Sequence, residues 1–417
     1  MLIQRPQYIE RLKSFQDQDL IKVITGLRRS GKSTLFDLFI KDLRTHGVEQ
    51  SQIFRINFDD PSYEFDSAKD LYDYILKHID ARRKTYIFLD EVQLVPDFQK
   101  AVNGLRLKSN LDIYITGSNA YLLSGQLATL LSGRYIEIHM LPLSFREYLT
   151  GLYPQIKSVA TLKRKINLDA ALKDYLNFGG LPQTIQHYSE HDGLMVPNAT
   201  EINEYIENIF GTIVYKDAML HGGITSRNLL ERIIKFILDN IGQPTSIKKI
   251  TDVLNTNTQK VNYRAVENCI TALEESFLIY RADRYDVRGR ALLSTGYKYF
   301  VSDLGLRSYL LGRNTSVDEG QLLENVVYLE LLRRRKQVRV GKYDNLEVDF
   351  VASSNNENSY YQVSKSVANA DILARELNSL QSIADNYPKY LLTGDNSAIN
   401  KDGIIGKTVT DWLLEDN

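Results

Sequence analysis

The sequence of 417 residues contains a single cysteine, Cys269. One thiol cannot form an internal disulfide or a zinc site built from several cysteines, so we expect Cys269 to be a small buried apolar side chain. The six histidines are scattered and match no metal-binding spacing. No apolar run approaches the roughly 18 residues of a membrane-spanning helix, and the first residues lack the apolar core of a signal peptide. From these absences we expect a cytoplasmic protein with no membrane partner.

Neither sign of charge is in surplus, because the sequence contains 51 Lys and Arg residues and 52 Asp and Glu residues. A chain with a net charge of −1 binds nucleic acid only through local basic patches. Two basic stretches could form such a patch, and each is equally compatible with an ordinary solvated face. The first contains Arg333, Arg334, Arg335, Lys336, Arg339 and Lys342. The second, diluted by two aspartates, contains Arg281, Arg284, Arg288, Arg290 and Lys298.

One octapeptide, Gly26-Leu27-Arg28-Arg29-Ser30-Gly31-Lys32-Ser33, fits the pattern G-x-x-x-x-G-K-[ST]. Residues 20–25 before it are mostly apolar and β-branched, which is typical of a buried strand. Apolar residues after it recur at helical spacing. Strand, glycine-rich loop and helix is the order that brings backbone N–H groups and a helix N-terminus to phosphate oxygens. We therefore predict a phosphate-binding P-loop.

The loop residues have expected tasks in binding ATP. Lys32 is expected to reach the β- and γ-phosphates, and the Ser33 hydroxyl is expected to bind Mg²⁺. Arg28 and Arg29 could touch phosphates, but they could equally meet a neighbouring subunit or pack against a lid. The expected nucleotide-binding residues here are Gly26, Arg29, Ser30, Gly31, Lys32, Ser33 and Thr34.

Residues 86–89 form a short apolar run that ends in Asp90 and Glu91, which is the form of a Walker B strand. Asp90 is expected to hold Mg²⁺, directly or through water. Glu91 is expected to orient or deprotonate the water that attacks ATP. Many buried strands end in acidic residues, so this signal gains its strength from the P-loop that precedes it.

Another strand, predicted over residues 111–116, is followed by Gly117-Ser118-Asn119. A polar side chain at this position can reach the γ-phosphate and the attacking water. We assign this catalytic role to Asn119 first and to Ser118 second. The alternative is that the polar group only caps the following helix, which is predicted over residues 121–132.

The segments predict a multidomain α/β protein. Residues 1–150 alternate strands and helices, which indicates a parallel sheet covered on both faces. Ligands of such sheets sit at the carboxyl ends of the strands, where these motifs fall. Residues 151–235 read as a helical lid, and residues 236–302 as three helices and a hairpin, the pattern of a winged helix. Residues 303–417 predict a second α/β domain.

Taken together, the motifs resemble a family of prokaryotic AAA+ ATPases that join an N-terminal ATPase to a winged-helix region and a C-terminal domain of unknown function. The resemblance covers nearly the whole chain. Beyond the motifs above it rests on Leu131-Ser132-Gly133-Arg134, residues 141–148 and Phe178-Gly179-Gly180-Leu181-Pro182.

The resemblance adds two expected contacts to the nucleotide. Arg134 falls at the position of an arginine finger, which a neighbouring subunit supplies to the γ-phosphate, and this implies a homo-oligomer. The alternative is a surface arginine paired with Glu137. Pro182 belongs to an element similar to one that lies near the adenine in related ATPases. The alternative there is a helix stop and a turn.

The C-terminal region resembles the restriction-endonuclease fold, in which acidic residues and a lysine bind metal and activate water. Glu324 and Asp349 match the two acids of that motif. Gln362 stands where a further acid is expected, and Ser364 stands where the lysine is expected. The resemblance therefore implies a domain that is catalytically degenerate and binds nucleic acid or protein.

We therefore expect an ATPase that uses Mg²⁺ and couples its nucleotide cycle to DNA binding or remodelling. Helix 263–278 carries glutamates on its exposed side, so Arg284, Arg288 and Arg290 of the wing are the better expected DNA contacts. One alternative is a nucleotide-controlled switch that acts on a protein partner. Another is an ATP-regulated nuclease.

Overall fold

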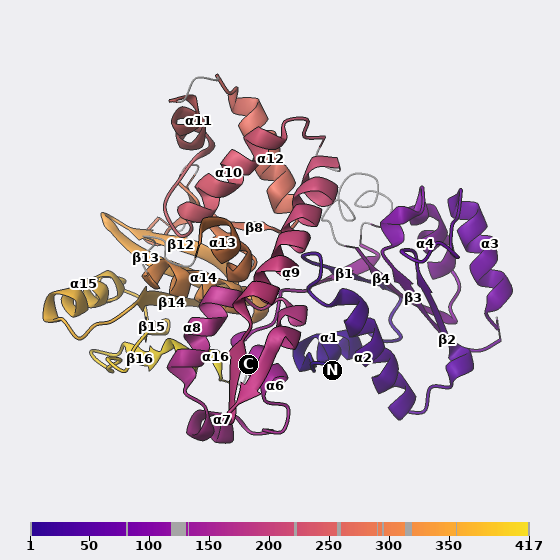
Figure 1. Ribbon diagram of the computed structural model, residues 1–417, viewed down its shortest axis with the longest axis horizontal. Helices are drawn as coiled ribbons and strands as arrows, with labels where there is room; N and C mark the ends of the chain where they lie inside the picture. The colour runs from indigo at the N-terminus through magenta and orange to yellow at the C-terminus, as the bar shows by residue number, and fades with distance from the viewer. Residues whose placement is uncertain are drawn as a thin grey trace. The chain divides into compact units, whose positions relative to one another are not determined.

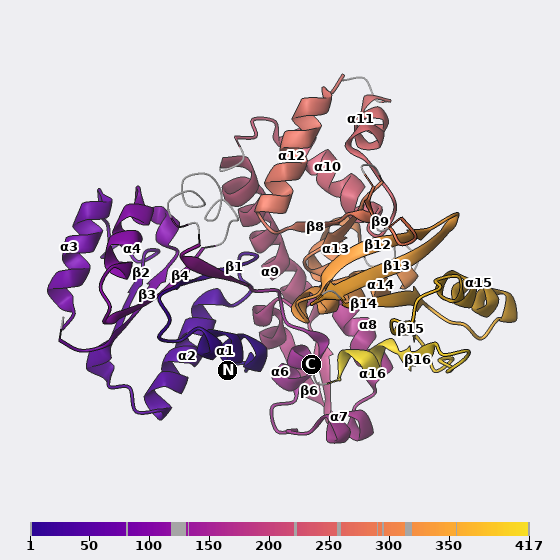
Figure 2. The same ribbon diagram turned by 180° about the vertical axis from the view of Figure 1, so that it is seen from behind.

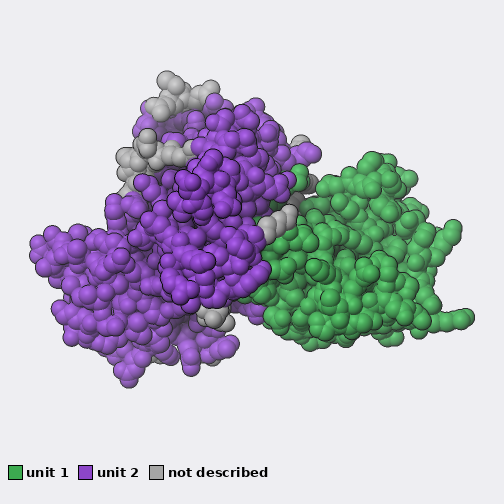
Figure 3. All heavy atoms as spheres, turned by 60° about the horizontal axis from the view of Figure 1, so that its bottom comes forward, with its two compact units in different colours: residues 1–142, 275–277 green, residues 143–274, 278–417 purple. Residues whose placement is uncertain are grey.

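The computed structural model describes residues 2–80, 82–117, 131, 133–220, 223–256, 260–289, 291–293, 296–312, 319–355 and 357–415. The chain divides into two compact units, which Figure 3 colours separately. Unit 1 comprises Met1–Pro142 and Glu275–Phe277, and unit 2 comprises Leu143–Glu274 and Leu278–Asn417. No helix among the described residues is long and apolar enough to cross a bilayer.

Unit 1 is built on a parallel sheet whose described strands follow the order β2-β3-β4-β1-β5. The P-loop strand β1 therefore lies between β4 and β5, and β4 separates it from the strand that ends in Asp90 (Figure 1). Consecutive β-α units force this parallel arrangement, because each helix returns the chain to the same end of the sheet. The strands are β1 (Ile21–Thr25), β2 (Ile53–Asn57), β3 (Thr85–Asp90), β4 (Leu111–Thr116) and β5 (Tyr135–His139).

Helices cover both faces of this sheet, as Figures 1 and 2 show. On one face, α3 (Ala68–His78) and α4 (Phe98–Arg106) pack against Ile87, Leu89 and other buried strand residues. On the other face, α1 (Pro6–Ser14) and α2 (Lys32–Thr45) pack against a second cluster. The predicted strands and helices of residues 1–117 are thereby found within a few residues of their expected bounds. The helix predicted over residues 121–132 lies almost wholly outside the described residues.

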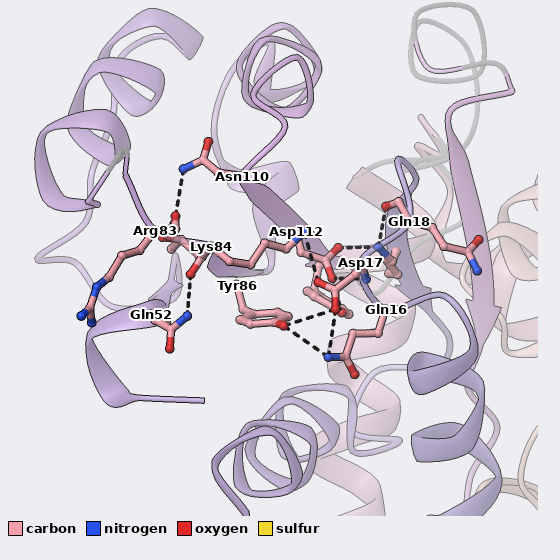
Figure 4. Close-up of polar contacts among 12 residues, drawn as sticks. Gln16, Asp17, Gln18, Gln52, Arg83, Lys84, Tyr86, Asn110 and Asp112 are labelled. Atoms are coloured by element: carbon pink, nitrogen blue, oxygen red, sulfur yellow. Dashed lines mark hydrogen bonds and ion pairs between the residues drawn. The ribbon is translucent and has the colours of Figure 1, made fainter. Parts of the chain in front are cut away.

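A polar cluster lies at the amino-terminal edge of the sheet, away from the strand ends that carry the motifs (Figure 4). Lys22 of β1 and Asp112 of β4 form a fully buried ion pair. The backbone N–H of Asp17 donates to Asp112 Oδ2 (2.9 Å), and Gln16 Nε2 donates to Tyr86 Oη (3.3 Å). Breaking one partner of a buried pair leaves an uncompensated charge, which is strongly destabilising. The cluster therefore fixes the register of three neighbouring strands.

Unit 2 begins with helices, as expected for residues 151–235, but it also contains a β-hairpin that the sequence did not suggest. The hairpin pairs β6 (Tyr188–His191) with β7 (Leu194–Pro197). The helical segments up to this point and beyond it are α6 (Phe145–Leu152), α7 (Val159–Lys165), α8 (Leu168–Phe178), η4 (Pro182–His187), α9 (Ala199–Thr212) and the π-helix η5 (Ile213–Leu220).

Three further helices and an antiparallel pair of strands follow in the order predicted for a winged helix. They are α10 (Arg227–Asp239), α11 (Ile247–Asn255), α12 (Tyr263–Glu275), β8 (Ile279–Ala282) and β11 (Lys298–Val301). The segment between β8 and β11 differs from a free wing, because β9 (Arg284–Asp286) pairs with a strand of the C-terminal sheet and also with β10 (Ala291–Leu292). The winged helix and the boundaries at residues 150, 235 and 302 stay predictions.

The C-terminal part of unit 2 is a mixed sheet with described strand order β10-β9-β12-β13-β14-β15-β16. Helix α15 (Ala370–Gln381) packs on one core cluster of this sheet, which contains Val351 and Tyr360. The elements are α13 (Leu304–Leu311), α14 (Glu319–Arg333), β12 (Gln337–Tyr343), β13 (Leu346–Ser354), β14 (Glu357–Ser364), β15 (Lys389–Thr393), β16 (Ile405–Thr408) and α16 (Val409–Leu413). The predicted α/β character of residues 303–417 is thus present, and α13 and β16 were not predicted.

Candidate nucleotide-binding site

The glycine-rich loop joins the carboxyl end of β1 to α2, and two glycines give it its shape. Gly26 has φ +140°, and a Cβ atom there would lie 2.1 Å from the carbonyl oxygen of Met140. Gly31 has φ +101° and immediately precedes α2. A side chain at either position would be strained, and at Gly26 it would also clash with backbone. The loop can therefore close tightly over the N-terminus of α2, where backbone N–H groups attract anions.

Lys32 and Ser30 supply two polar side chains at this loop. The buried Lys32 ammonium donates to the carbonyl oxygens of Gly26 (3.0 Å) and Leu27 (3.1 Å). Arg5 holds the loop from outside by donating to the carbonyl oxygen of Ser30 (3.1 Å). Ser30 Oγ is buried and has no hydrogen-bond partner among the described atoms. A cation over the loop and an unsatisfied hydroxyl fit the phosphates of a nucleotide.

Asp90 lies at the end of β3 and is fully buried. Burial raises the pKa of its carboxyl group, and hydrogen bonds from Thr116 and Ser33 partly offset that effect. Asp90 Oδ1 accepts the Thr116 bond at 2.5 Å, while Oδ2 has no hydrogen-bond partner among the described atoms and lies 3.7 Å from Arg55 Nη2. A buried carboxylate beside the Ser33 hydroxyl is the pair of oxygen ligands that Mg²⁺ takes in P-loop proteins. Ser33 and Asp90 thus fit the predicted metal site.

Glu91 follows directly and has a different environment. Its φ of +56° places it in the left-handed region, so the chain turns sharply at the end of β3. Its backbone N–H donates to Thr116 Oγ1 (2.9 Å), and Gln93 Nε2 donates to its carboxylate. The half-buried side chain keeps access to solvent. These features fit the expected role of Glu91 in orienting or deprotonating water.

Sequence reasoning missed Thr116 and Arg55. Thr116 ends β4, which lies between the P-loop strand and the Asp90 strand, so its hydroxyl contacts both acidic residues. The signal was the polar end of that strand, which we assigned to Asn119 and Ser118; both of these lie outside the described residues. Arg55 on β2 pairs with Asp37 of α2 and lies near Asp90. No motif marks this arginine, because strand pairing alone brings it there.

His139 at the end of β5 is a further side chain that the motifs did not indicate. Its Nδ1 lies 3.2 Å from Thr25 Oγ1, next to the loop. Burial and the charge of Lys32 lower the pKa of His139 to about 4. The imidazole is therefore neutral at neutral pH, and it adds no positive charge beside the lysine.

Arg134 lies in the turn before β5 and is exposed. Its Nη1 is 3.4 Å from Asn103 Oδ1, while Glu137, the alternative partner considered for it, accepts a hydrogen bond from Thr25 Oγ1 (2.5 Å). Arg134 thus does not take up the pairing with Glu137 that was the alternative. Its action as an arginine finger, and the catalytic role of Asn119, stay predictions.

The Gly179-Gly180-Leu181-Pro182 element belongs to unit 2, where its glycines make room for a buried aspartate. A Cβ atom on Gly179 would lie 2.0 Å from Asp303 Oδ1. The backbone N–H of Gly180 donates to Asp303 Oδ2 (2.6 Å). Helix α8 also ends at Phe178, with Gly179 at φ +75° after it, which fits the helix stop and turn given as the alternative for this element. Pro182 begins η4, and its contact with the nucleotide stays a prediction.

The acidic residues of the endonuclease-like motif also come together in unit 2, but a lysine lies among them. Lys298 Nζ is 2.8 Å from Glu347, 3.3 Å from Glu324 and 4.0 Å from Asp349. Burial opposes the charged form, yet these three carboxylates outweigh it and raise the pKa of Lys298. Gln362 Nε2 donates to Glu376 (2.8 Å). Among the described residues, no group of three or more acids, histidines or cysteines is arranged to hold a metal ion.

This geometry corrects part of the sequence interpretation. Lys298 is 3% exposed, so it contributes nothing to the surface patch in which we placed it. It brings an ammonium to the motif from β11, although Ser364 has replaced the expected lysine. Arg333 and Arg334 also turn inward and pair with Glu330, so the first basic stretch presents fewer cations than expected. Arg290 of the second stretch lies outside the described residues.

Comparisons with known proteins agree with the P-loop geometry. A sequence family described as an AAA domain matches residues 18–149, and a domain of unknown function (DUF8612) matches residues 169–317. An uncharacterized Methanocaldococcus jannaschii protein is 28% identical over 391 residues, which cover 91% of this chain and 83% of that protein.

Solved structures show a more distant likeness. The Walker-type ATPase of Pyrococcus abyssi is 14% identical, with 74% of this chain and 95% of that chain covered and a TM-score of 0.45. The Aeropyrum pernix Orc1 protein, solved in complex with DNA, is also 14% identical, with 75% and 93% covered and a TM-score of 0.32.

An uncharacterized Haemophilus influenzae protein is 37% identical to this chain over 419 residues, which span 99% of both proteins. The chain therefore belongs to the same family as the Haemophilus influenzae protein, and it contains an AAA-type ATPase domain followed by the domain of unknown function.

Proposed function

We propose that this protein is a Mg²⁺-dependent ATPase that couples its nucleotide cycle to DNA binding or remodelling. The observation that carries the ATPase part is the convergence of Ser33, Asp90 and Glu91 beside the P-loop, with Thr116 contacting both acids. Bound Mg²⁺ would neutralise phosphate charge between Ser33 and Asp90. Lys32 would contact the phosphates, and Glu91 would orient the attacking water or accept its proton.

The link to DNA has separate support in unit 2. Arg288 of the wing segment and Arg335 beyond α14 are exposed, and Arg339 on β12 is half-buried. Strand β9 joins the wing segment to β12, so the two basic stretches meet on one sheet. The nuclease alternative is disfavoured because Gln362 stands in place of an acid of the motif and its amide donates to Glu376 (2.8 Å).

The test is ATP turnover by the purified full chain over a series of protein concentrations. Duplex, single-stranded and branched DNA are each added at low and moderate salt, because phosphate contacts weaken as salt rises. Turnover that rises with DNA supports the proposal. If none of the three nucleic acids changes the turnover rate, the DNA link is contradicted. That result favours the switch that acts on a protein partner.

Two variants test the chemistry within the same experiment. Glu91→Gln is expected to retain ATP binding and to lower turnover by about 10²- to 10⁴-fold, because it removes the group that accepts the proton. Lys32→Ala is expected to lose tight nucleotide binding. If Glu91→Gln hydrolyses ATP at the native rate, the assignment of Glu91 is wrong.

A further inference from the structure

Unit 2 contains a groove of about 850 Å³ that borders the core cluster beneath α15. Its lining comes from β9, β12, β13 and β14, and from the segment that follows α15. Figure 1 shows α15 beside the strands β13, β14 and β15. The volume lies within the range of about 300–1,000 Å³ that is usual for ligand sites. None of its residues belongs to the P-loop or to the Lys298 cluster.

The charge of the lining is positive. Arg288, Arg335 and Arg339 line the groove, and Asp385 is the one acidic residue among the described lining residues. Asp385 already accepts a hydrogen bond from Tyr360 Oη (2.5 Å). Arg288 is paired with Asp344 (3.1 Å), so the surplus of positive charge comes from Arg335 and Arg339 against Asp385. Guanidinium groups bind phosphate oxygens in a bidentate manner.

Aromatic rings accompany these arginines. Tyr285, Tyr343 and Tyr387 line the groove and are each half-buried, so part of each side chain is accessible. The Arg339 guanidinium lies 5.2 Å from the centre of the Tyr285 ring. A groove lined by arginine and tyrosine side chains lets unpaired bases stack while their phosphates are neutralised. Ser353 Oγ donates to Asn358 Oδ1 (2.7 Å), and both polar side chains line the groove beside these rings.

A second hollow of about 840 Å³ shares Arg288 with the groove and is lined by Lys342, Asp286 and Asp344 as well. The groove therefore continues past Arg288 into a second hollow, and this length favours a polymer over a single nucleotide. The concave shape of the two hollows favours unpaired bases, because a duplex turns its phosphates outward and keeps the faces of its bases stacked. We propose that the groove binds single-stranded nucleic acid, with the arginines on phosphates and the tyrosines on bases. This proposal rests on the nucleic-acid link of the proposed function, and it adds the strand type and the place of binding.

The experiment measures binding of the full chain to labelled single-stranded DNA, single-stranded RNA and duplex DNA of equal length by fluorescence anisotropy. We expect both single strands to bind more tightly than the duplex. The double variant Arg335→Ala/Arg339→Ala is expected to bind single strands at least 10-fold more weakly and to reduce the slope of log affinity against log salt by about 1 to 1.5. Lys401→Ala, an exposed lysine of unit 2 outside the groove, is the matched control and is expected to change little.

Tyr343→Leu separates stacking from charge, because it keeps an apolar side chain against the core and removes the aromatic ring. Its expected effect is a loss of about 5- to 150-fold in single-strand affinity with an unchanged salt slope. Native ATP turnover in the absence of nucleic acid and a native circular dichroism spectrum show that each variant is folded.

The outcomes are distinguishable. If the native chain binds single strands but the double variant binds them equally well, the groove is the wrong place, and the nucleic-acid link stands. Preference for duplex overturns the strand type. Failure to bind any nucleic acid overturns both the groove and the DNA link, while the ATPase is judged by turnover alone. A preference for DNA over RNA, or the reverse, that is lost in the double variant supports the groove and shows which single strand it binds more tightly.

Discussion

Thr116 is uncharged, yet it contacts both acidic residues of the candidate nucleotide site. Its hydroxyl donates to Asp90 and accepts from the backbone N–H of Glu91. One donor and two acceptor positions are what a hydroxyl offers, so this side chain ties the Asp90 carboxyl group to the backbone of Glu91. Few other residue types could replace it without moving one of them.

The variant Thr116→Val keeps the shape of the side chain and removes the hydroxyl. We expect kcat to fall by about 10- to 100-fold because Glu91 loses its fixed position, while the Kd for ATP changes little. Steady-state turnover and nucleotide titration measure the two quantities. Thr116→Ser retains the hydroxyl and is expected to keep most of the activity, and native turnover by the valine variant would refute the role.

His139 makes the free energy of unfolding depend on pH. Its folded-state pKa is lowered to about 4 by burial and by Lys32, whereas an unfolded histidine titrates near 6.5. Below pH 6.5 the unfolded chain therefore binds the proton first, so stability falls as the pH drops from about 6.5 toward 4. Urea unfolding at pH 7 and pH 5 should show a smaller loss in His139→Gln, by on the order of 1 kcal/mol. His191→Gln, at an exposed site, should lose stability as the native chain does.

At the residue scale, the motifs predicted Lys32, Ser33, Asp90 and Glu91, and the structure brings these residues together. They could be predicted because each stands at a fixed position beside a glycine-rich loop or an apolar strand. Thr116, Arg55 and His139 could not, because they enter the site through strand order, which a single sequence does not give. Lys298 reaches its acidic cluster from another strand for the same reason.

At the scale of the element, Asp303 joins two helical segments of unit 2. It caps α13 by accepting from the N–H groups of Gly305 (2.9 Å) and Leu306 (3.4 Å), and it also accepts from Gly180. Burial raises the pKa of this carboxyl group to about 6, although those N–H groups oppose the shift. The carboxylate thus satisfies backbone donors that would otherwise be buried without partners.

Replacing this residue should be costly. Asp303→Ala leaves three buried N–H groups unsatisfied and is expected to lower the free energy of unfolding by about 2–4 kcal/mol. Ser226→Ala removes the exposed cap of α10 and is expected to cost about 0.5–1 kcal/mol. Urea unfolding of both variants measures the difference, and equal losses would contradict the role of the buried cap.

Individual strands were easier to predict than the pairing between them. Alternating β-α segments identified the parallel sheet of unit 1, since apolar runs and helical periodicity are local signals. The segment between β8 and β11 was predicted as a wing, but its strands pair with the C-terminal sheet. Pairing between residues far apart in the chain leaves no local signal.

At the scale of the whole molecule, Arg134 allows a test of whether subunits share an active site. If Arg134 acts on a neighbouring subunit, a mixture of inactive Arg134→Ala and inactive Lys32→Ala proteins should regain turnover. In that mixture, an intact P-loop meets an intact arginine across some interfaces. Turnover by the mixture over a range of protein concentrations measures this recovery. A mixture that stays as inactive as its components would show that Arg134 does not act between subunits.

The Lys298 ammonium has a consequence for how the two units respond to chelation. In unit 2, three carboxylates surround a cation that is covalently part of the chain and cannot be removed by EDTA. In unit 1, by contrast, the metal that we propose between Ser33 and Asp90 would come from solution. Removing divalent ions should therefore stop hydrolysis, whereas the acidic cluster of unit 2 keeps the counter-ion that the chain itself supplies.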